Sequence, residues 1–169
     1  MERIQHLVVM GVAGCGKSTF GQALGAALGW PVDDGDAFHA QSSIDKMRAG
    51  FALQDADRAP WLDALVERLR QRQRAGQASV LTCSSLKRAY RDRLRTAGEG
   101  LRFIHLDGDR ALLERRLAAR TGHFFPASLL ASQLAALEPL GGDEDGVVIS
   151  IDRTVPQQVR ECLQALNLA

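Results

Sequence analysis

Apolar residues along this chain form short runs that are typical of buried β-strands. Five such segments cover residues 7–10, 30–36, 78–83, 101–106 and 147–151. The first of them is apolar throughout, as expected for a central parallel strand that is covered on both faces. The second ends in an acidic turn rather than in another apolar residue.

Between these segments, apolar residues recur at the three- and four-residue spacing of helices that bury one face. The predicted helices cover residues 20–28, 43–50, 60–69, 86–96, 109–120, 127–137 and 155–166, with residues 51–58 as a loop. Strands that alternate with helices predict an α/β fold. At 169 residues the chain is long enough for one such domain, spanning residues 1–169, and too short for two ordinary ones.

A glycine-rich segment joins the first predicted strand to the first predicted helix. Residues 11–18 read G-V-A-G-C-G-K-S, which matches the phosphate-loop template G-x-x-x-x-G-K-[ST] in the required strand–loop–helix context. Its backbone N–H groups would bind phosphate oxygens, with Lys17 near the β- and γ-phosphates and Ser18 on a magnesium ion. The expected nucleotide-binding residues are Gly11, Val12, Ala13, Gly14, Cys15, Gly16, Lys17, Ser18 and Thr19.

The acidic turn after the second strand contains Asp34 and Asp36. In open α/β sheets ligands bind beyond the carboxyl ends of the strands, which is where the phosphate loop also lies. Phosphoryl transfer needs one group that organises the metal and another that accepts the proton of the attacking hydroxyl. We therefore expect Asp34 at the metal and Asp36 at the acceptor hydroxyl.

Two groups of basic residues are candidates for an anionic substrate. Arg58 stands at a loop–helix junction, where its guanidinium would bind either a substrate carboxylate or the neighbouring Asp55 or Asp57. On the helix at residues 86–96, Lys87 and Arg91 lie one turn apart near the start and are predicted to face the substrate. For Arg88, Arg93 and Arg95 a solvated surface is expected.

Arg116 and Arg120 lie one turn apart at the end of a predicted helix, before the segment Thr121-Gly122-His123-Phe124-Phe125-Pro126. We interpret residues 121–126 as a short lid that closes over the nucleotide, excludes water and brings one or both arginines to the transferring phosphate. The alternative is a plain connector between helices, with Phe124 and Phe125 in the core.

Composition narrows the classes of partner. The formal net charge is +1, so no nucleic-acid partner is indicated. No apolar run approaches the length of a membrane span, so no membrane partner is expected. The three cysteines show no metal-ligand spacing and fit a reducing compartment, and we expect a cytoplasmic protein.

Taken together, these motifs resemble the small phosphate-loop gluconokinases, which are related to shikimate kinases and nucleoside monophosphate kinases. The resemblance covers nearly the whole chain. It rests on the phosphate loop, the Asp34-Gly35-Asp36 turn with Phe38-His39, the segment from Leu53 to Leu62, Cys83-Ser84 with Leu86-Lys87 and Tyr90-Arg91, and Gly122-His123-Phe124-Phe125. Departures from the family pattern, at Ala40, Ala52, Ser85 and Leu140, fall beside these residues rather than on them.

The resemblance implies a three-layer α/β/α sandwich with a five-stranded parallel sheet, and a homodimer. It implies transfer of the ATP γ-phosphate to the 6-hydroxyl of D-gluconate, with Mg²⁺. Lys17, Asp36 and Arg120 would then be catalytic, Arg116 and Arg120 would contact the nucleotide, and Ser18 and Asp34 would hold the metal. The sugar-acid pocket would be lined by Asp36, His39, Arg58, Lys87, Arg91 and His123.

Two alternatives compete with this interpretation. A kinase of another small hydroxy acid, such as shikimate, would use the same phosphoryl chemistry. A non-catalytic nucleotide-binding regulator would share the loop, but the usual guanine-reading Asn-Lys-x-Asp element is excluded because the sole asparagine is Asn167.

Overall fold

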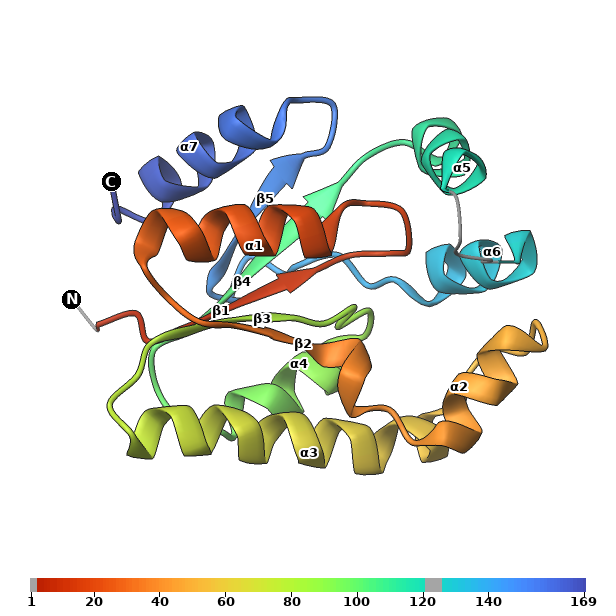
Figure 1. The fold of residues 1–169 in the computed structure, drawn as a ribbon, viewed down its shortest axis with the longest axis horizontal. Coiled ribbons are helices and arrows are strands. Elements are labelled where there is room, and N and C mark those ends of the chain that lie inside the picture. The colour runs from red at the N-terminus through yellow and green to blue at the C-terminus, as the bar shows by residue number, and fades with distance from the viewer. Residues whose placement is uncertain (1–2, 121–125) are drawn as a thin grey trace.

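The computed structural model describes residues 3–120 and 126–169. Within them, five parallel strands form one sheet in the order β2-β3-β1-β4-β5 (Figure 1). The strands are β1 (His6–Met10), β2 (Val32–Asp34), β3 (Ser79–Thr82), β4 (Leu101–Asp107) and β5 (Gly146–Ser150). In the central strand, Val8 pairs with Leu81 of β3 and Phe103 of β4. The prediction of a central, fully buried first strand is confirmed, because every residue of β1 is buried.

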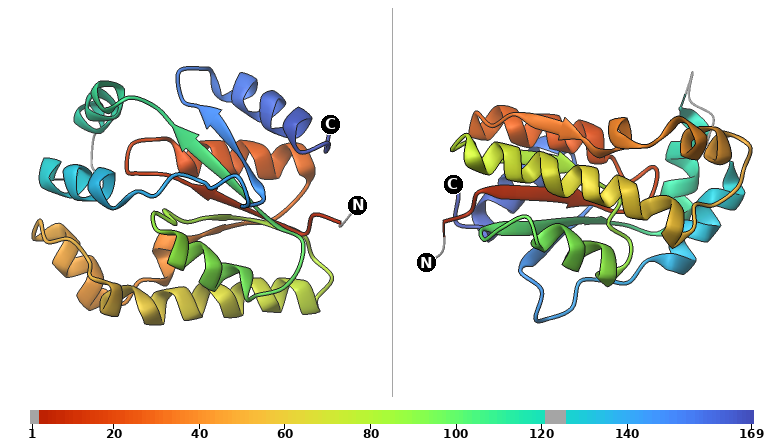
Figure 2. Two further views of the ribbon diagram at one scale, coloured as in Figure 1. Left: turned by 180° about the vertical axis from the view of Figure 1, so that it is seen from behind. Right: turned by 90° about the horizontal axis from the view of Figure 1, so that it is seen from below.

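Helices cover both faces of this sheet. They are α1 (Lys17–Leu28), α2 (Gln41–Arg48), α3 (Asp55–Arg74), α4 (Arg88–Arg95), α5 (Arg110–Ala119), α6 (Ala127–Ala136) and α7 (Val155–Ala165), with a 3₁₀ helix η1 (Gly35–Phe38) after β2. Helices α1 and α7 lie on one face and α3 and α4 on the other (Figures 1 and 2). The predicted three-layer α/β/α fold is confirmed.

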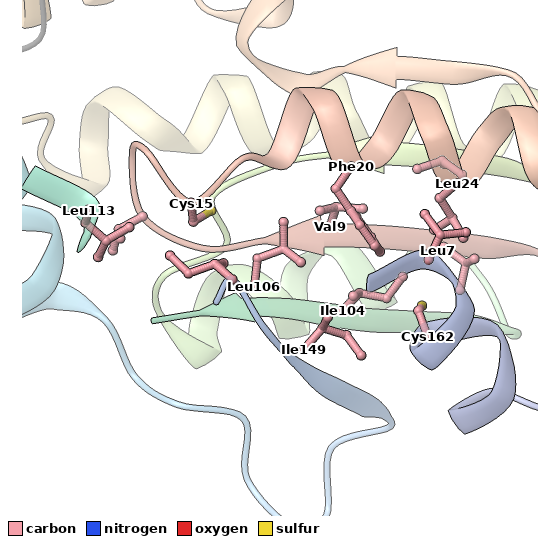
Figure 3. Close-up of a cluster of buried hydrophobic side chains, with 14 of the residues drawn as sticks. Leu7, Val9, Cys15, Phe20, Leu24, Ile104, Leu106, Leu113, Ile149 and Cys162 are labelled. Atoms are coloured by element: carbon pink, nitrogen blue, oxygen red, sulfur yellow. The ribbon is translucent and has the colours of Figure 1, made fainter. Parts of the chain in front are cut away.

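Each face of the sheet has its own apolar core. On the α1 side, Phe20 and Leu24 pack against Ile104 of β4 and Cys162 of α7 (Figure 3). On the α3 side, Trp61 and other apolar residues of the helix pack against β1, β3 and β4. Burying one large apolar side chain contributes about 1.5–3 kcal/mol, so these two cores hold the central strands in place.

Helix α3 begins earlier than the sequence predicted. Residues 55–58 were expected in a loop, but the helix starts at Asp55. Its N-terminus is closed by a capping box in which the Asp57 carboxylate accepts a hydrogen bond from the backbone N–H of Gln54, at 2.7 Å. The expected start at Pro60 was wrong because the cap lies one and a half turns before that proline. This earlier start places Arg58 on a helix.

Ion pairs to a buried aspartate join α3 to the edge strand β2. Asp33 of β2 is 8% exposed and accepts hydrogen bonds from Arg68 and Arg72 of α3. The distances are 2.8 Å from Arg68 Nη2 to Oδ1 and 3.0 Å from Arg72 Nε to Oδ2. Burial acts to raise the Asp33 pKa, but the hydrogen bonds and charges of Arg72 and Arg68 outweigh it, and the net pKa is lowered. These ion pairs hold the edge strand β2 against α3.

The phosphate loop, α2, α5 and α6 gather at the carboxyl ends of the strands, and the two chain termini lie at the opposite end (Figure 1). Figure 2 shows the same grouping from behind and from below. In the described part of the chain, no helix combines the length and apolar character needed to cross a bilayer.

Candidate active site

The loop between β1 and α1 has a backbone that only glycine fits at critical positions. Gly11 has φ +143°, and a Cβ there would lie 2.8 Å from the carbonyl oxygen of Leu106. Gly14 has φ +82°, and its Cβ would lie 2.9 Å from Leu117 Cγ of α5. These φ values and close approaches exclude larger residues. The loop therefore folds as the sequence template predicts, tightly against β4 and α5.

Lys17 opens α1 at the inner side of this loop. Its half-buried side chain turns back, and Nζ donates to the carbonyl oxygens of Gly11 and Val12 at 2.9 and 3.2 Å. Ser18 and Thr19 follow as exposed residues of the first helical turn. The unpaired N–H groups and positive dipole end of α1 make this position suited to phosphate.

A cavity of about 700 Å³ opens directly in front of the loop. It brings together phosphate-loop residues 13–19 with Asp36, His39, Arg58, Arg116 and Arg120, all of which the sequence placed in one site. Gly11 and Val12, the first two residues of the loop, are buried and are not among the residues that line the cavity. Asp34, Lys87 and Arg91 are not among the residues that line the cavity.

The acidic turn positions its two aspartates differently. Asp34 ends β2, is exposed, and its Oδ1 accepts hydrogen bonds from the Asp36 N–H at 3.0 Å and the Thr82 hydroxyl at 3.4 Å. This fixes the start of η1, which then presents Asp36 to the cavity. Gly35 between them has to be small, because a Cβ would lie 2.2 Å from the Thr82 carbonyl oxygen.

His39 stacks on Trp61 of α3, with ring centroids 4.2 Å apart and an interplanar angle of 14°. The Trp61 indole N–H donates to the carbonyl oxygen of Gly35 at 2.8 Å, so the stack is also anchored to the acidic turn. Trp61 falls in the helix predicted over residues 60–69, which was expected to bury its apolar face, and it is both buried and part of the cavity wall. Sequence periodicity identified its burial but not its contact with His39.

Burial lowers the pKa of His39, the Asp36 carboxylate acts to raise it, and the Arg58 guanidinium adds a smaller lowering effect. The net pKa lies below 6.5, so the ring is mainly neutral at pH 7. Its Nδ1 atom is buried and has no hydrogen-bond partner among residues 3–120 and 126–169. His39 lines the cavity, and a neutral imidazole has one donor and one acceptor nitrogen for contacts with a hydroxyl-rich ligand.

Arg58 contacts Tyr90 rather than forming the surface ion pair that the sequence left open. Its Nη1 donates to the Leu53 carbonyl oxygen at 2.6 Å and to the Tyr90 hydroxyl at 3.3 Å. The nearby carboxylates have other partners, Asp57 pairing with Lys46 and Asp55 with Lys87. The guanidinium therefore lies at the cavity wall, held by neutral oxygen atoms.

Lys87 contacts Tyr90, as Arg58 does, but it does not line the cavity. Its Nζ pairs with Asp55 at 3.1 Å and lies 5.6 Å from the centroid of the Tyr90 ring. The Tyr90 hydroxyl also donates to Asp55. Tyr90 thus joins Lys87 to Arg58, a link that no spacing in the sequence indicated.

The expectation that Arg91 faces the substrate is wrong in this structure. Its side chain is fully buried, and Nε lies 2.8 Å from Oε2 of the equally buried Glu144. Its remaining donors contact the carbonyl oxygens of Ser85, Leu86 and Pro139. Helical spacing predicted Lys87 and Arg91 on one face, but Lys87 is the N-cap residue before α4 and pairs with Asp55, whereas Arg91 packs against Glu144.

Arg116 of α5 and Arg120, the C-cap residue after this helix, also line the cavity. Arg116 is held by backbone, with Nη2 2.8 Å from the Ile151 carbonyl oxygen and Nη1 3.5 Å from that of Cys15. The expected lid at residues 121–126 and the candidate His123 lie outside the described residues, except for Pro126, which is the N-cap residue before α6.

Sequence reasoning missed one contact in the phosphate loop. The side-chain oxygen of Gln133 in α6 accepts a hydrogen bond from the Ala13 N–H at 2.7 Å. The apolar spacing of residues 127–137 predicted the helix, but not which polar residue would meet the loop. Arg153 and Val155 also contribute to the wall of the cavity.

The residues present also fit the metal that the family resemblance implies. Ser18 lines the cavity, and the Asp34 carboxylate is exposed at the carboxyl end of β2, two strands away from β1 in the sheet. Both supply hard oxygen atoms, and Mg²⁺ is usually bound through one or two protein oxygens together with phosphate and water.

Comparison with known proteins agrees with this geometry. Residues 7–140 match the family described as "AAA domain". A gluconokinase of Gluconobacter oxydans is 49% identical over 146 residues, covering 86% of this chain and 82% of that protein. The thermoresistant gluconokinase of Escherichia coli is 40% identical, with 95% and 92% of the two chains covered.

Solved structures give the same result. The crystal structure of a gluconokinase from Sinorhizobium meliloti has a TM-score of 0.88 and 44% identity, covering 98% of this chain and 93% of that one. A sugar kinase from a Janibacter species has a TM-score of 0.93 and 43% identity, with 98% and 96% covered. These similarities extend over nearly the full chain, and the phosphate loop and the acidic turn contribute to one cavity. This protein therefore belongs to the gluconokinase family of phosphate-loop kinases.

Proposed function

We propose that this protein transfers the γ-phosphate of ATP to the 6-hydroxyl of D-gluconate, giving 6-phospho-D-gluconate and ADP. The observation that carries the proposal is the shared cavity, in which phosphate-loop residues 13–19 meet Asp36, His39 and Arg58. A phosphate donor and a hydroxylated acid would thus meet in one enclosed space. The relatives' names supply the identity of the acceptor.

The nucleotide would be bound by the loop amides and the first turn of α1. Lys17 would exchange its contacts with Gly11 and Val12 for phosphate oxygens. Arg116 and Arg120, which line the same cavity, would add positive charge where charge develops on the transferring phosphate. Ser18 and Asp34 would hold Mg²⁺, which when bound neutralises charge on the terminal phosphates.

The acceptor would be oriented by residues around the acidic turn. Asp36 would accept the proton of the 6-hydroxyl. The neutral His39 ring would hydrogen-bond a sugar hydroxyl, and Arg58 would bind the carboxylate, with Lys87 adding positive charge from behind Tyr90. Arg91 has no place in this pocket because Glu144 and backbone carbonyls bind its guanidinium. A role for His123 stays a prediction.

A panel of acceptors tests the proposal. Release of ADP is measured with Mg²⁺-ATP alone and after addition of D-gluconate, other sugar acids or shikimate. We expect ADP release to rise sharply with D-gluconate and to require Mg²⁺, and NMR of the product to show phosphate on the 6-hydroxyl. Equal ADP release without any acceptor would contradict a kinase, and a preference for shikimate would favour the other hydroxy-acid kinase.

The proposal includes two points about the protein in the cell. A homodimer is implied by the family resemblance, and sedimentation velocity at micromolar concentration tests it. A cytoplasmic location follows from the metabolite substrate and from the three free, buried cysteines. Fractionation of the source cells tests this location.

A further inference from the structure

Helix α6 reaches the phosphate loop through a single polar side chain. Gln133 is half-buried, and its Oε1 accepts the Ala13 N–H at 2.7 Å, across 120 residues of sequence. The helix itself is anchored by Leu129 and Leu130, which are 5% and 2% exposed. The position of Gln133 is therefore set by a packed helix rather than by a free surface side chain.

The N–H group that Gln133 occupies is one that the phosphate loop would offer to a nucleotide. A backbone N–H has one hydrogen to donate, so it can serve either the Gln133 oxygen or a phosphate oxygen at full strength. Ala13 lies two residues after Gly11, whose carbonyl oxygen accepts a hydrogen bond from Lys17 Nζ, the group that the proposed site places at the β- and γ-phosphates. The competing ligand is therefore a terminal phosphate.

Gln133 also borders the acceptor side of the site. Together with Leu129 it lines the main cavity and a small neighbouring one, which Met47, Leu53 and Arg58 also line. Releasing Gln133 from Ala13 would free the cavity-facing side of α6 next to these residues. The same side chain thus adjoins both halves of the proposed site.

We propose that Gln133 is an internal ligand of the phosphate loop that competes with the terminal phosphate of the nucleotide for the Ala13 N–H. Its amide oxygen satisfies this donor when no phosphate is bound, and it lowers the affinity for nucleoside triphosphate. The inference rests on the proposed nucleotide site and is independent of which acid is the acceptor.

Two substitutions of Gln133 are expected to change the affinity for nucleotide in opposite directions. Gln133→Leu has similar size but no acceptor, so the non-hydrolysable analogue AMPPNP with Mg²⁺ should bind about threefold to tenfold more tightly, as expected for one lost competing hydrogen bond. Gln133→Glu keeps an acceptor and adds negative charge, so AMPPNP should bind more weakly than to the wild type. AMP, which lacks terminal phosphates, should bind all three proteins equally.

Isothermal titration without gluconate measures these affinities, and Gln164→Leu on the exposed face of α7 is the matched control, expected to bind like the wild type. In ¹⁵N spectra without nucleotide, the Ala13 amide proton should move upfield in Gln133→Leu, as for a lost hydrogen bond. An unchanged Ala13 signal, or AMPPNP affinity equal to or weaker than the wild type's in Gln133→Leu, would overturn the inference. If wild-type protein bound no AMPPNP at all, the nucleotide site itself would be wrong and the inference with it.

Discussion

The guanidinium of Arg91 and the carboxylate of Glu144 form a buried ion pair, with Nε 2.8 Å from Oε2 and Nη2 3.1 Å from Oε1. Their side chains are 0% and 1% exposed. The pair joins α4 to the loop before β5, 53 residues later in the sequence. It holds in place the helix whose Tyr90 contacts Arg58.

Removing the charge of Glu144 should destabilise the fold strongly. In Glu144→Gln, the Arg91 cation stays buried without its counterion, and we expect a loss of about 3–5 kcal/mol in the free energy of unfolding. Urea denaturation measures it. The matched control is Glu114→Gln in the exposed pair with Arg110, where the side chains are 53% and 60% exposed and the expected loss is below about 1 kcal/mol. Equal losses in the two variants would contradict a structural role for Arg91.

The Asp33 contact with Arg68 and Arg72 should make stability depend on pH. Because the native pKa of Asp33 is lowered from 3.8, its stabilising effect is complete above that value and is lost as the pH falls through the native pKa. Asp33→Asn should therefore be less stable than the wild type by about 1–3 kcal/mol at pH 7. In urea denaturation this difference should shrink below pH 3.8.

Asp45→Asn serves as the control for this pH dependence, because Asp45 is an exposed residue of α2. Its effect should stay below about 0.5 kcal/mol at either pH. A deficit of Asp33→Asn that stayed constant into acid would show that the charge of Asp33 is not what stabilises the edge strand.

Lys17→Ala should remove charge stabilisation that matters mainly in the transition state. We expect kcat to fall by about 10²–10³-fold, by analogy with other lost electrostatic donors. Steady-state assays with saturating D-gluconate measure it, and thermal unfolding checks that the fold is kept. Arg110→Ala, which removes a positive charge from an exposed part of α5, should retain wild-type kcat. Full activity of the Lys17→Ala variant would show that Lys17 does not contribute to catalysis.

Asp36→Asn should keep the shape of the acidic turn while removing the proton acceptor. We expect kcat to fall by about 10²–10⁴-fold, with little change in the KM for ATP. Asp45→Asn, which changes an exposed aspartate outside the cavity lining, should leave kcat unchanged. Full turnover by Asp36→Asn would mean that another group accepts the proton.

The sequence predicted those parts of the protein that depend on neighbours along the chain. The strand–loop–helix arrangement around residues 11–18 was predicted correctly because it depends on local properties, namely the glycine φ values and the dipole of α1. Asp36 and Arg116 were brought to one cavity because strand ends and following helices meet at one edge of a parallel sheet.

Contacts between distant segments could not be predicted in this way. Periodicity predicted Arg91 on the same helical face as Lys87, but the residue that buries Arg91 is Glu144, which comes from a loop with no recognisable pattern. The Gln133 contact with Ala13 likewise depends on how α6 packs. His39 was recognised through family resemblance, whereas its stacking on Trp61 required the folded α3.

The central claim is that phosphate-loop amides and the Asp36 carboxylate act on two substrates in one cavity. A crystal structure with AMPPNP, Mg²⁺ and D-gluconate tests it most directly. The account predicts terminal phosphates on the amides of residues 13–19, with the gluconate 6-hydroxyl within hydrogen-bond distance of Asp36 and in line with the γ-phosphate. Gluconate bound elsewhere, or with its carboxylate rather than its 6-hydroxyl at Asp36, would contradict the account.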